Sequence, residues 1–290
     1  ENRGPRKVAP TFIPKGLINM AAGLLAIRYG LQGPNKGVVS ACASGNHALG
    51  DAADCIRLGK ADVVVTGGAE AGVTRLGVAG FNAMRALSMR NDAPEHASRP
   101  FDKDRDGFVM GEGAAIFVLE SEAHARARGA EILCEVAGMG ETNDAKHIVA
   151  PREDGAPVAK AIRIALEEAQ LNPGDVDYYN AHGTSTPLND PMEARALQTV
   201  FGDDAPLVSS TKSMTGHLLG AASAIEAVAT IQAIGTGTVP PNINYDTPDP
   251  DCPVPRLVAN TAQEARVDVA VSNGLGFGGH NAAVVLRRYA

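Results

Sequence analysis

The stretch Val39-Ser40-Ala41-Cys42, followed by His47-Ala48-Leu49-Gly50-Asp51-Ala52, decides the fold because its pattern returns later in the chain. The counterpart is Ser209-Ser210-Thr211-Lys212, followed by His217-Leu218-Leu219-Gly220-Ala221-Ala222. In both places a short run typical of a buried strand leads into a helical pattern of small residues. The sequence therefore predicts two related strand-to-helix units.

Two further pairs of apolar runs follow these units in the same order. Asp62–Thr66 is similar to Asp268–Ser272, and Gly113–Val118 is similar to Asn281–Leu286. Chance similarity between strands rich in Ala and Val is the alternative explanation. Three matches in one order favour two copies of a single α/β unit.

Strand-like runs alternate with helical patterns along the chain, which predicts a layered α/β fold. The expected strands cover residues 38–40, 62–66, 114–119, 132–137, 176–180, 207–209, 267–272 and 282–286. The expected helices cover residues 17–29, 45–58, 158–170, 191–200 and 216–234. We place the two halves at residues 1–130 and 131–290. The first half has little chain before Val38, so we expect it to lack a leading strand–helix–strand segment.

Composition narrows the class of protein. The 290 residues are 44% hydrophobic and 20% charged, which suits a soluble globular protein. No apolar run reaches the ~18 residues of a membrane helix, so no membrane span is expected. The net charge of −7 argues against nucleic-acid binding. The four cysteines form no C-x-x-C pair, so neither a metal site nor a disulfide framework is expected, and a reducing compartment is favoured.

Cys42 is the candidate nucleophile. It lies where an expected strand ends and an expected helix begins, and a helix N-terminus lowers the pKa of a thiol. The alternative is a small buried core residue. Cys55, Cys134 and Cys252 have no comparable setting.

Polar residues gather at the ends of two further expected strands. His182 follows residues 176–180, and Lys212 and His217 follow residues 207–209. Such positions at the carboxyl ends of strands form sites in α/β proteins. Glu226 lies on an otherwise apolar helix, where a buried carboxylate needs a partner such as Lys212. A single core histidine is more often structural, but this grouping favours a reactive site.

The stretch Gly274-Leu275-Gly276-Phe277-Gly278-Gly279 formally matches the dinucleotide-binding pattern G-x-G-x-x-G. That pattern needs a helix after the glycines, whereas Ala282–Leu286 is typical of a strand. We therefore expect a tight loop whose backbone N–H groups can face an oxyanion.

Four motifs together resemble the β-ketoacyl-acyl-carrier-protein synthases, and the elongating type II enzymes in particular. They are Ala41–Gly45, Asn180–Pro187, Ser210–His217 and Gly276–Gly279. The resemblance runs from Gly4 to Tyr289. It implies a thiolase-like fold of two pseudo-equivalent halves, layered α-β-α-β-α, and a homodimer.

The resemblance also implies roles for the motif residues. Cys42 matches the nucleophile that carries the acyl chain, and His182 and His217 match the pair that acts on a malonyl thioester. Lys212 matches the family lysine and Glu226 its buried partner. The other implied residues are Phe277 (oxyanion N–H and acyl gate), Thr184 and Thr186 (pantetheine arm), Phe81 (substrate binding), and Arg6, Lys7 and Arg85 (carrier-protein docking).

The implied reaction is a decarboxylating Claisen condensation of the acyl-Cys42 intermediate with malonyl-acyl carrier protein, which lengthens a fatty acyl chain by two carbons. It needs no metal or other cofactor, because the phosphopantetheine arrives on the carrier protein. The expected location is a bacterial cytoplasm. The alternatives are a polyketide ketosynthase, an inactive fragment, or a partner subunit; Cys42 argues against the last.

The chain departs from the family at the glycine loop. Relatives commonly have Ser-Phe where this chain has Gly274-Leu275. The loss of a ring beside Phe277 is expected to loosen the acyl gate and change acyl preference.

Overall fold

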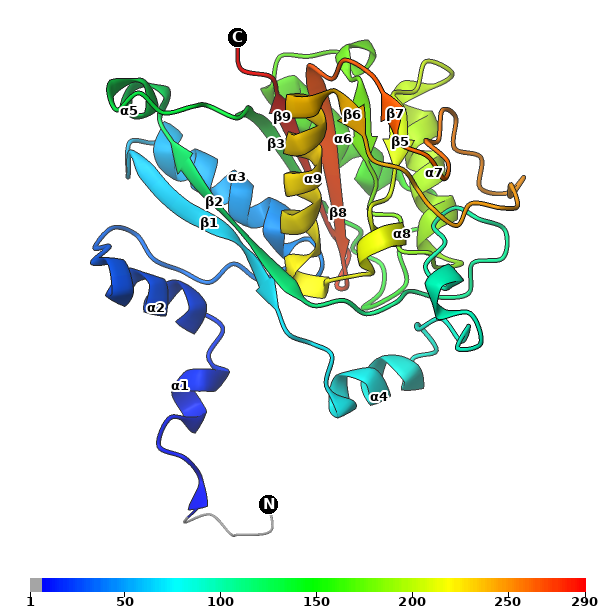
Figure 1. Cartoon of the computed structure of the whole chain (residues 1–290), viewed down its shortest axis with the longest axis horizontal. Helices are drawn as coiled ribbons and strands as arrows, with labels where there is room; N and C mark the ends of the chain where they lie inside the picture. The colour runs from blue at the N-terminus through cyan, green and yellow to red at the C-terminus, as the bar shows by residue number, and fades with distance from the viewer. Residues whose placement is uncertain (1–6) are drawn as a thin grey trace.

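The structure is a computed structural model that describes residues 7–290. Figure 1 shows a layered arrangement in which two helices lie between a two-stranded sheet and a five-stranded sheet. The small sheet contains β1 (Val63–Glu70) and β2 (Gly113–Glu120), and the middle helices are α3 (Ser44–Arg57) and α9 (Ala222–Thr236). The predicted alternation of strands and helices is confirmed.

The five-stranded sheet has the order β3-β9-β8-β4-β5. Its strands are β3 (Glu135–Asn143), β9 (His280–Arg287), β8 (Val269–Gly276), β4 (Tyr178–Asn180) and β5 (Leu207–Ser209). β4 runs parallel to both neighbours, whereas β9 is antiparallel to β3 and β8. The β8–β9 hairpin matches the β1–β2 pair, as the internal repeat predicts.

Alternate residues of the large sheet face two different cores, because side chains alternate along a strand. Tyr179 and Val271 face the core formed with α6 (Ala156–Glu168) and α7 (Asn189–Phe201). Tyr178 and Ala270, their neighbours along the chain, face the core formed with the middle helices. The sheet is therefore buried on both faces, which explains the continuous apolar runs of its strands.

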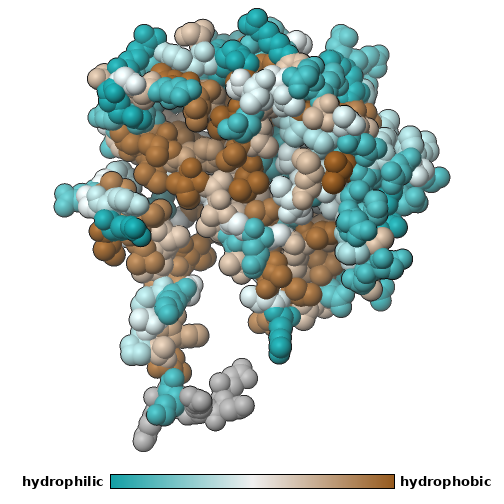
Figure 2. Space-filling view, viewed as in Figure 1, coloured by the Kyte–Doolittle hydropathy of each residue, from teal (hydrophilic) through white to brown (hydrophobic). Residues whose placement is uncertain are grey.

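The small sheet is covered on one face only. Thr66 points inward and its hydroxyl donates a hydrogen bond to the carbonyl of Ala48 on α3. The outward side chains of β1 and β2 are exposed, and Figure 2 shows apolar residues gathered there. These residues are Val63, Val65, Ile116 and Val118.

One predicted strand is wrong. Residues 38 and 39 belong to no strand, and Ser40 makes a single isolated bridge. A strand needs a neighbour for its backbone N–H and C=O groups, and residues 7–290 place none beside this segment. The other strands form with ends shifted by a few residues.

The helix expected over residues 216–234 begins later, at Ala222. The preceding residues form a single turn, α8 (Lys212–Thr215), and a short 3₁₀ turn over Leu219–Ala221. The long helix therefore begins soon after Cys42 in the first copy (α3 at Ser44) but well after Lys212 in the second (α9 at Ala222). The other α-helices and strands of the described chain are α1 (Phe12–Gly16), α2 (Met20–Tyr29), α4 (Arg75–Ala83), α5 (Glu122–Ala127), β6 (Thr238–Val239) and β7 (Gln263–Glu264).

The starts of α3 and α9 meet between the two sheets. A Cβ atom on Gly45 would collide with the backbone nitrogen of Ala224. Only glycine allows this approach, which brings the Cys42 region against the second half of the chain. Leu219–Thr236 is also long and apolar enough to cross a membrane, but 56% of this window is buried, as expected of a core helix between two sheets.

Candidate active site

Cys42 lies on a tight turn that leads into α3. Ala41 has a φ of 51°, and the Ser44 hydroxyl donates a hydrogen bond to the Ala41 carbonyl at 2.6 Å. The same hydroxyl accepts a hydrogen bond from the Ser40 N–H at 2.9 Å. These local bonds hold a left-handed conformation that is unusual for a residue with a side chain. The turn presents Cys42 to a cavity.

The prediction of a lowered thiol pKa is wrong. Burial raises the pKa of Cys42 to about 12, and the nearby ammonium group of Lys212 offsets only part of this effect. Cys42 precedes the N-cap residue Ala43, so it lies outside the first turn of α3. Because the helix dipole decays within the first turn, desolvation dominates. The free thiol is therefore protonated near neutral pH.

His182 follows β4 on a loop that a buried carboxylate holds. Oε1 of Glu193 accepts the His182 N–H, and Oε2 accepts the Gly183 N–H, both at 2.8 Å. Oε1 also accepts hydrogen bonds from Tyr179 and Asn273. Glu193 on α7 therefore fixes the backbone that carries His182.

The two candidate histidines lie edge to face, with ring centroids 5.4 Å apart. Nδ1 of His217 accepts the Leu219 N–H at 3.3 Å, and Nδ1 of His182 lies 3.3 Å from Nζ of Lys212. Both Nδ1 atoms therefore face donors. This pattern assigns the proton of each neutral ring to Nε2.

Both imidazoles are held neutral. Burial lowers the pKa of His182 well below its ordinary value, and the charge of Lys212 and then His217 lower it further. Burial and then Lys212 do the same to the pKa of His217. Two buried neutral rings can each offer one N–H donor.

Lys212 and Glu226 form an ion pair behind the histidines. Both side chains are almost completely buried, and Nζ of Lys212 donates to Oε1 of Glu226. Burial raises the pKa of Glu226, while Lys212 opposes the rise. The predicted partnership of these two residues is present in the structure.

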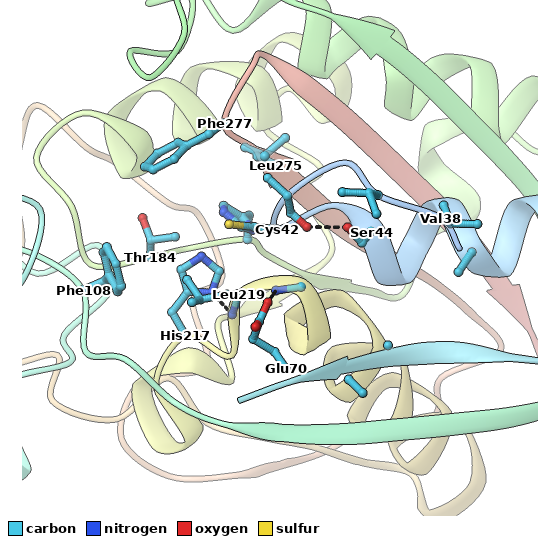
Figure 3. Close-up of a pocket in the computed structure, with 18 of the residues that line it drawn as sticks. Val38, Cys42, Ser44, Glu70, Phe108, Thr184, His217, Leu219, Leu275 and Phe277 are labelled. Atoms are coloured by element: carbon cyan, nitrogen blue, oxygen red, sulfur yellow. Dashed lines mark hydrogen bonds between the residues drawn. The ribbon is translucent and has the colours of Figure 1, made fainter. Parts of the chain in front are cut away.

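One cavity of about 1040 Å³ joins most of the predicted site residues. Figure 3 shows Cys42 and His217 facing it, with Phe277 on the side opposite His217. The predicted site residues that line it are Cys42, His182, His217, Thr184, Thr186, Phe277, Phe81 and Arg85. The fold therefore brings together residues that lie in separate sequence motifs.

Phe277 lies in the turn between β8 and β9. The residue is 37% exposed and lines the cavity wall. Leu275, two residues earlier, is buried and also lines the cavity. The segment after the glycines is strand β9, which confirms that this is not a dinucleotide-binding loop.

The two threonines share a hydrogen bond. Oγ1 of Thr184 lies 2.9 Å from Oγ1 of Thr186, and both residues follow His182 on one loop. Phe81 packs edge to face against Phe108, which packs in turn against His217. These contacts form a second wall of the cavity.

The structure describes two of the three expected docking residues. Arg85 is exposed at the cavity and Lys7 is exposed near the start of the described chain, whereas Arg6 lies outside the described residues. Lys7 does not line the cavity.

Glu193 and Asp190 belong to the site although no sequence motif predicts them. Asp190 is also fully buried, and one carboxylate oxygen accepts the backbone N–H groups of Phe101 and Ser185. In the sequence, Asp190 and Glu193 look like acidic residues on a solvent-exposed helix face. Their role becomes visible only in the structure, where both carboxylates bind backbone N–H groups of the loop that carries His182. Within residues 7–290, no three His, Cys, Asp or Glu side chains are grouped to hold a metal ion.

Comparison with known proteins gives the same assignment for both parts of the chain. Residues 1–125 match the family described as beta-ketoacyl synthase, N-terminal domain. Residues 133–246 match the beta-ketoacyl synthase, C-terminal domain.

Curated relatives match nearly the whole chain. A 3-oxoacyl-[acyl-carrier-protein] synthase 2 from Rhizobium meliloti is 52% identical, over 99% of this chain and 69% of its own length. A protein of the same name from Synechocystis is 51% identical, over 99% of this chain and 70% of its own length.

Solved structures share the fold. A type II polyketide acyl carrier protein in complex with its ketosynthase matches with a TM-score of 0.96 and 38% identity, over 99% of this chain and 71% of that one. A β-ketoacyl synthase from Burkholderia phymatum matches with a TM-score of 0.90 and 39% identity, over 94% of this chain and 66% of that one. The expected thiolase-like ketosynthase fold is confirmed, and the chain belongs to the β-ketoacyl synthase family.

Proposed function

We propose that this chain is an acyltransferase that condenses an acyl group held on Cys42 with malonyl-acyl carrier protein. The product is a 3-oxoacyl thioester longer by two carbons, as in fatty acid elongation. The observation that carries the proposal is the meeting of Cys42, His182 and His217 at one cavity, with both Nε2–H groups available as donors.

The first half-reaction is acyl transfer to Cys42. The sulfur attacks the acyl thioester carbonyl, a new C–S bond forms, and the C–S bond to pantetheine breaks. The Cys42 proton is transferred to the leaving sulfur. The backbone N–H groups of Cys42 and Phe277 are our candidates for the donors that stabilise the tetrahedral oxyanion.

The second half-reaction uses the histidines. Malonyl thioester loses carbon dioxide, and the electron pair of the broken C–C bond forms an enolate. The Nε2–H groups of His182 and His217 donate to the enolate oxygen; loss of one such donor typically costs ~10²–10³ in rate. The enolate carbon then attacks the acyl-Cys42 carbonyl, and the Cys42 sulfur leaves as a thiolate that takes one proton from water. Decarboxylation supplies the carbanion, so the proposed reaction uses no cofactor.

The substrate arm would enter along the cavity. Thr184 and Thr186 are our candidates for holding the pantetheine, and Phe81 and Phe277 for the acyl chain. The carrier protein is the proposed partner, with Lys7, Arg85 and Arg6 as candidate docking residues. A local positive patch would offset the net charge of −7 toward an acidic partner.

We also propose a homodimer located in a bacterial cytoplasm. Helices α1 and α2 have no buried residues and expose large apolar side chains. These are Phe12, Ile13, Leu17, Ile18, Leu24, Ile27 and Tyr29. Apolar surface on this scale is typical of an interaction site.

The division of the chain into residues 1–130 and 131–290 stays a prediction.

The second candidate is a polyketide ketosynthase. Solved structures at 38% and 39% identity include a type II polyketide ketosynthase and the ishigamide ketosynthase/chain length factor. Both candidates use the same three side chains. The acyl groups that the chain accepts separate them, because fatty acid elongation extends a saturated acyl group whereas a polyketide ketosynthase can extend a chain that still carries its keto group.

One experiment tests the proposed activity. The chain is incubated with an acyl thioester and malonyl-acyl carrier protein, and mass spectrometry locates the acyl group and detects the 3-oxoacyl product. We expect acylation on Cys42 and loss of the product in Cys42→Ala. Acylation elsewhere, or condensation by Cys42→Ala, would contradict the proposal. Cys55→Ala is the matched control.

A further inference from the structure

We propose that Ser223 is a positioning residue for Cys42, and that Gly274 supplies the space its hydroxyl needs. Ser223 is the second residue of α9 and is fully buried. Its Oγ donates a hydrogen bond to the backbone carbonyl of Cys42 at 2.7 Å. This inference rests on the proposed function, in which Cys42 is the nucleophile.

The contact joins parts of the chain that are 181 residues apart. The other bonds of the turn are local, from Ser40, Ala43 and Ser44 to their near neighbours. Those bonds set the shape of the turn. The Ser223 hydroxyl instead ties the turn to α9, the helix that also carries Glu226.

Gly274 on β8 faces the same hydroxyl. A Cβ atom at this position would lie 2.5 Å from Oγ of Ser223, 3.2 Å from Nδ2 of Asn46 and 3.3 Å from Cα of Ala43, so the Ser223 hydroxyl is the group most strongly displaced. Gly274 is not among the glycines with positive φ, so its backbone conformation does not demand glycine. The demand is for space, and a side chain here would push the Ser223 hydroxyl away from Cys42.

The carbonyl of Cys42 belongs to the peptide that follows the nucleophile. A donor on that carbonyl limits rotation about the Cα–C bond of Cys42 and therefore fixes the direction of its thiol and N–H. A buried carbonyl that loses its donor shifts to find another. Small displacements of a reacting group cost large factors in rate. Acyl transfer should therefore depend on Ser223, whereas the histidines, which other contacts hold, should not.

The test uses Ser223→Ala, Gly274→Ala and the double variant, with Thr230→Val as control. Thr230 is also buried on α9, and its hydroxyl donates to a carbonyl of its own helix. Self-acylation of Cys42 and decarboxylation of the malonyl thioester are measured separately. Hydrogen exchange of residues 40–44 is followed in parallel and needs no substrate.

We expect Ser223→Ala to lower the rate constant of acylation about tenfold without changing KM. Decarboxylation should stay at the rate of the parent chain, and exchange of the Ala43 and Ser44 amides should accelerate. Gly274→Ala should lower acylation similarly, but should have a smaller effect in the Ser223→Ala background, because the hydroxyl it displaces is already gone. Thr230→Val should change none of these.

Two results would overturn the inference. One is acylation at the parent rate in Ser223→Ala. The other is an equal fall of both half-reactions in Ser223→Ala and Thr230→Val, which would indicate a general structural role. If the parent chain does not acylate Cys42, the proposed function fails instead. Hydrogen exchange then decides the role of Ser223, since unchanged exchange at residues 40–44 would overturn it.

Discussion

Nζ of Lys212 lies 3.3 Å from Nδ1 of His182, and the same ammonium group pairs with the carboxylate of Glu226. A buried cation beside an imidazole opposes a second positive charge on the ring. Lys212 therefore keeps His182 neutral and directs its Nε2–H toward the cavity. The carboxylate of Glu226 stabilises the buried positive charge of Lys212.

The first prediction concerns pH. Burial lowers the pKa of His182 most and Lys212 lowers it further, so removal of Lys212 should raise that pKa in part and move the acid limb of malonyl decarboxylation to higher pH. The double variant Lys212→Met/Glu226→Gln removes both buried charges and is the variant to measure between pH 5 and 9. Lys146→Met, which removes an exposed lysine, should leave the profile unchanged. An unmoved acid limb in the double variant would contradict this account.

The second prediction concerns stability. Lys212→Met and Glu226→Gln should each lower the free energy of unfolding by about 3–5 kcal/mol, because each single change leaves a buried partner unpaired. The double variant should lose less than the sum of the two. Urea unfolding of the four chains measures the coupling. Additive losses would show that the pair is not coupled.

The third prediction concerns the Cys42 thiol. Burial raises its pKa to about 12, so the thiolate fraction should grow tenfold per pH unit through the neutral range. The rate of iodoacetamide alkylation at Cys42, located by mass spectrometry, should therefore rise without a plateau from pH 7 to pH 10. Cys42→Ser provides the background rate. A plateau below pH 8 would mean that a neighbouring group activates the thiol in the free protein.

Local patterns in the sequence predict the strands and the residues at their ends well. The pairs β1–β2 and β8–β9 follow from apolar runs, and His182 and His217 follow from polar motifs after buried strands. Each of these features depends on residues close together in the chain. The internal repeat is the only sequence feature that relates distant segments, because it predicts that the two halves face each other.

The failures all depend on distant contacts. The Val38–Ser40 run has strand composition but no strand beside it within residues 7–290, and pairing decides whether a strand forms. Cys42 precedes a helix as predicted, yet its pKa depends on burial by other segments. Glu193 looks like a solvated helix residue until the fold places it under the His182 loop. Charge patterns along a chain do not reveal such packing.

The fourth prediction tests the docking residues. Arg85→Glu should weaken binding of the acidic carrier protein more than it changes turnover of a small uncharged acyl thioester, because Arg85 is exposed at the cavity and its charge acts mainly on an acidic partner. Lys7→Glu should have the same effect if the site extends to the start of the described chain. Lys160→Glu, an exposed change on α6, is the control. Titration of carrier protein against each variant measures the dissociation constant, and equal constants for Arg85→Glu and Lys160→Glu would remove Arg85 from the site.

The fifth prediction concerns acyl preference. Leu275 is buried beside Cys42 at the end of β8 and lines the cavity together with Phe277 (Figure 3). A ring at this position would take space from the acyl chain and restrict Phe277. Leu275→Phe should therefore lower kcat/KM for long acyl thioesters more than for short ones, with each excluded methylene worth about 1–3 kcal/mol.

The control for this experiment is Leu275→Met, which keeps side-chain volume and should keep the preference. Leu275→Phe should also cost about 1–3 kcal/mol of unfolding free energy through overpacking. A general loss of stability lowers kcat/KM for all chain lengths alike, so the ratio between long and short substrates isolates the effect on the cavity. An unchanged ratio would place the acyl chain elsewhere, because a ring added inside the acyl pocket cannot be neutral to chain length.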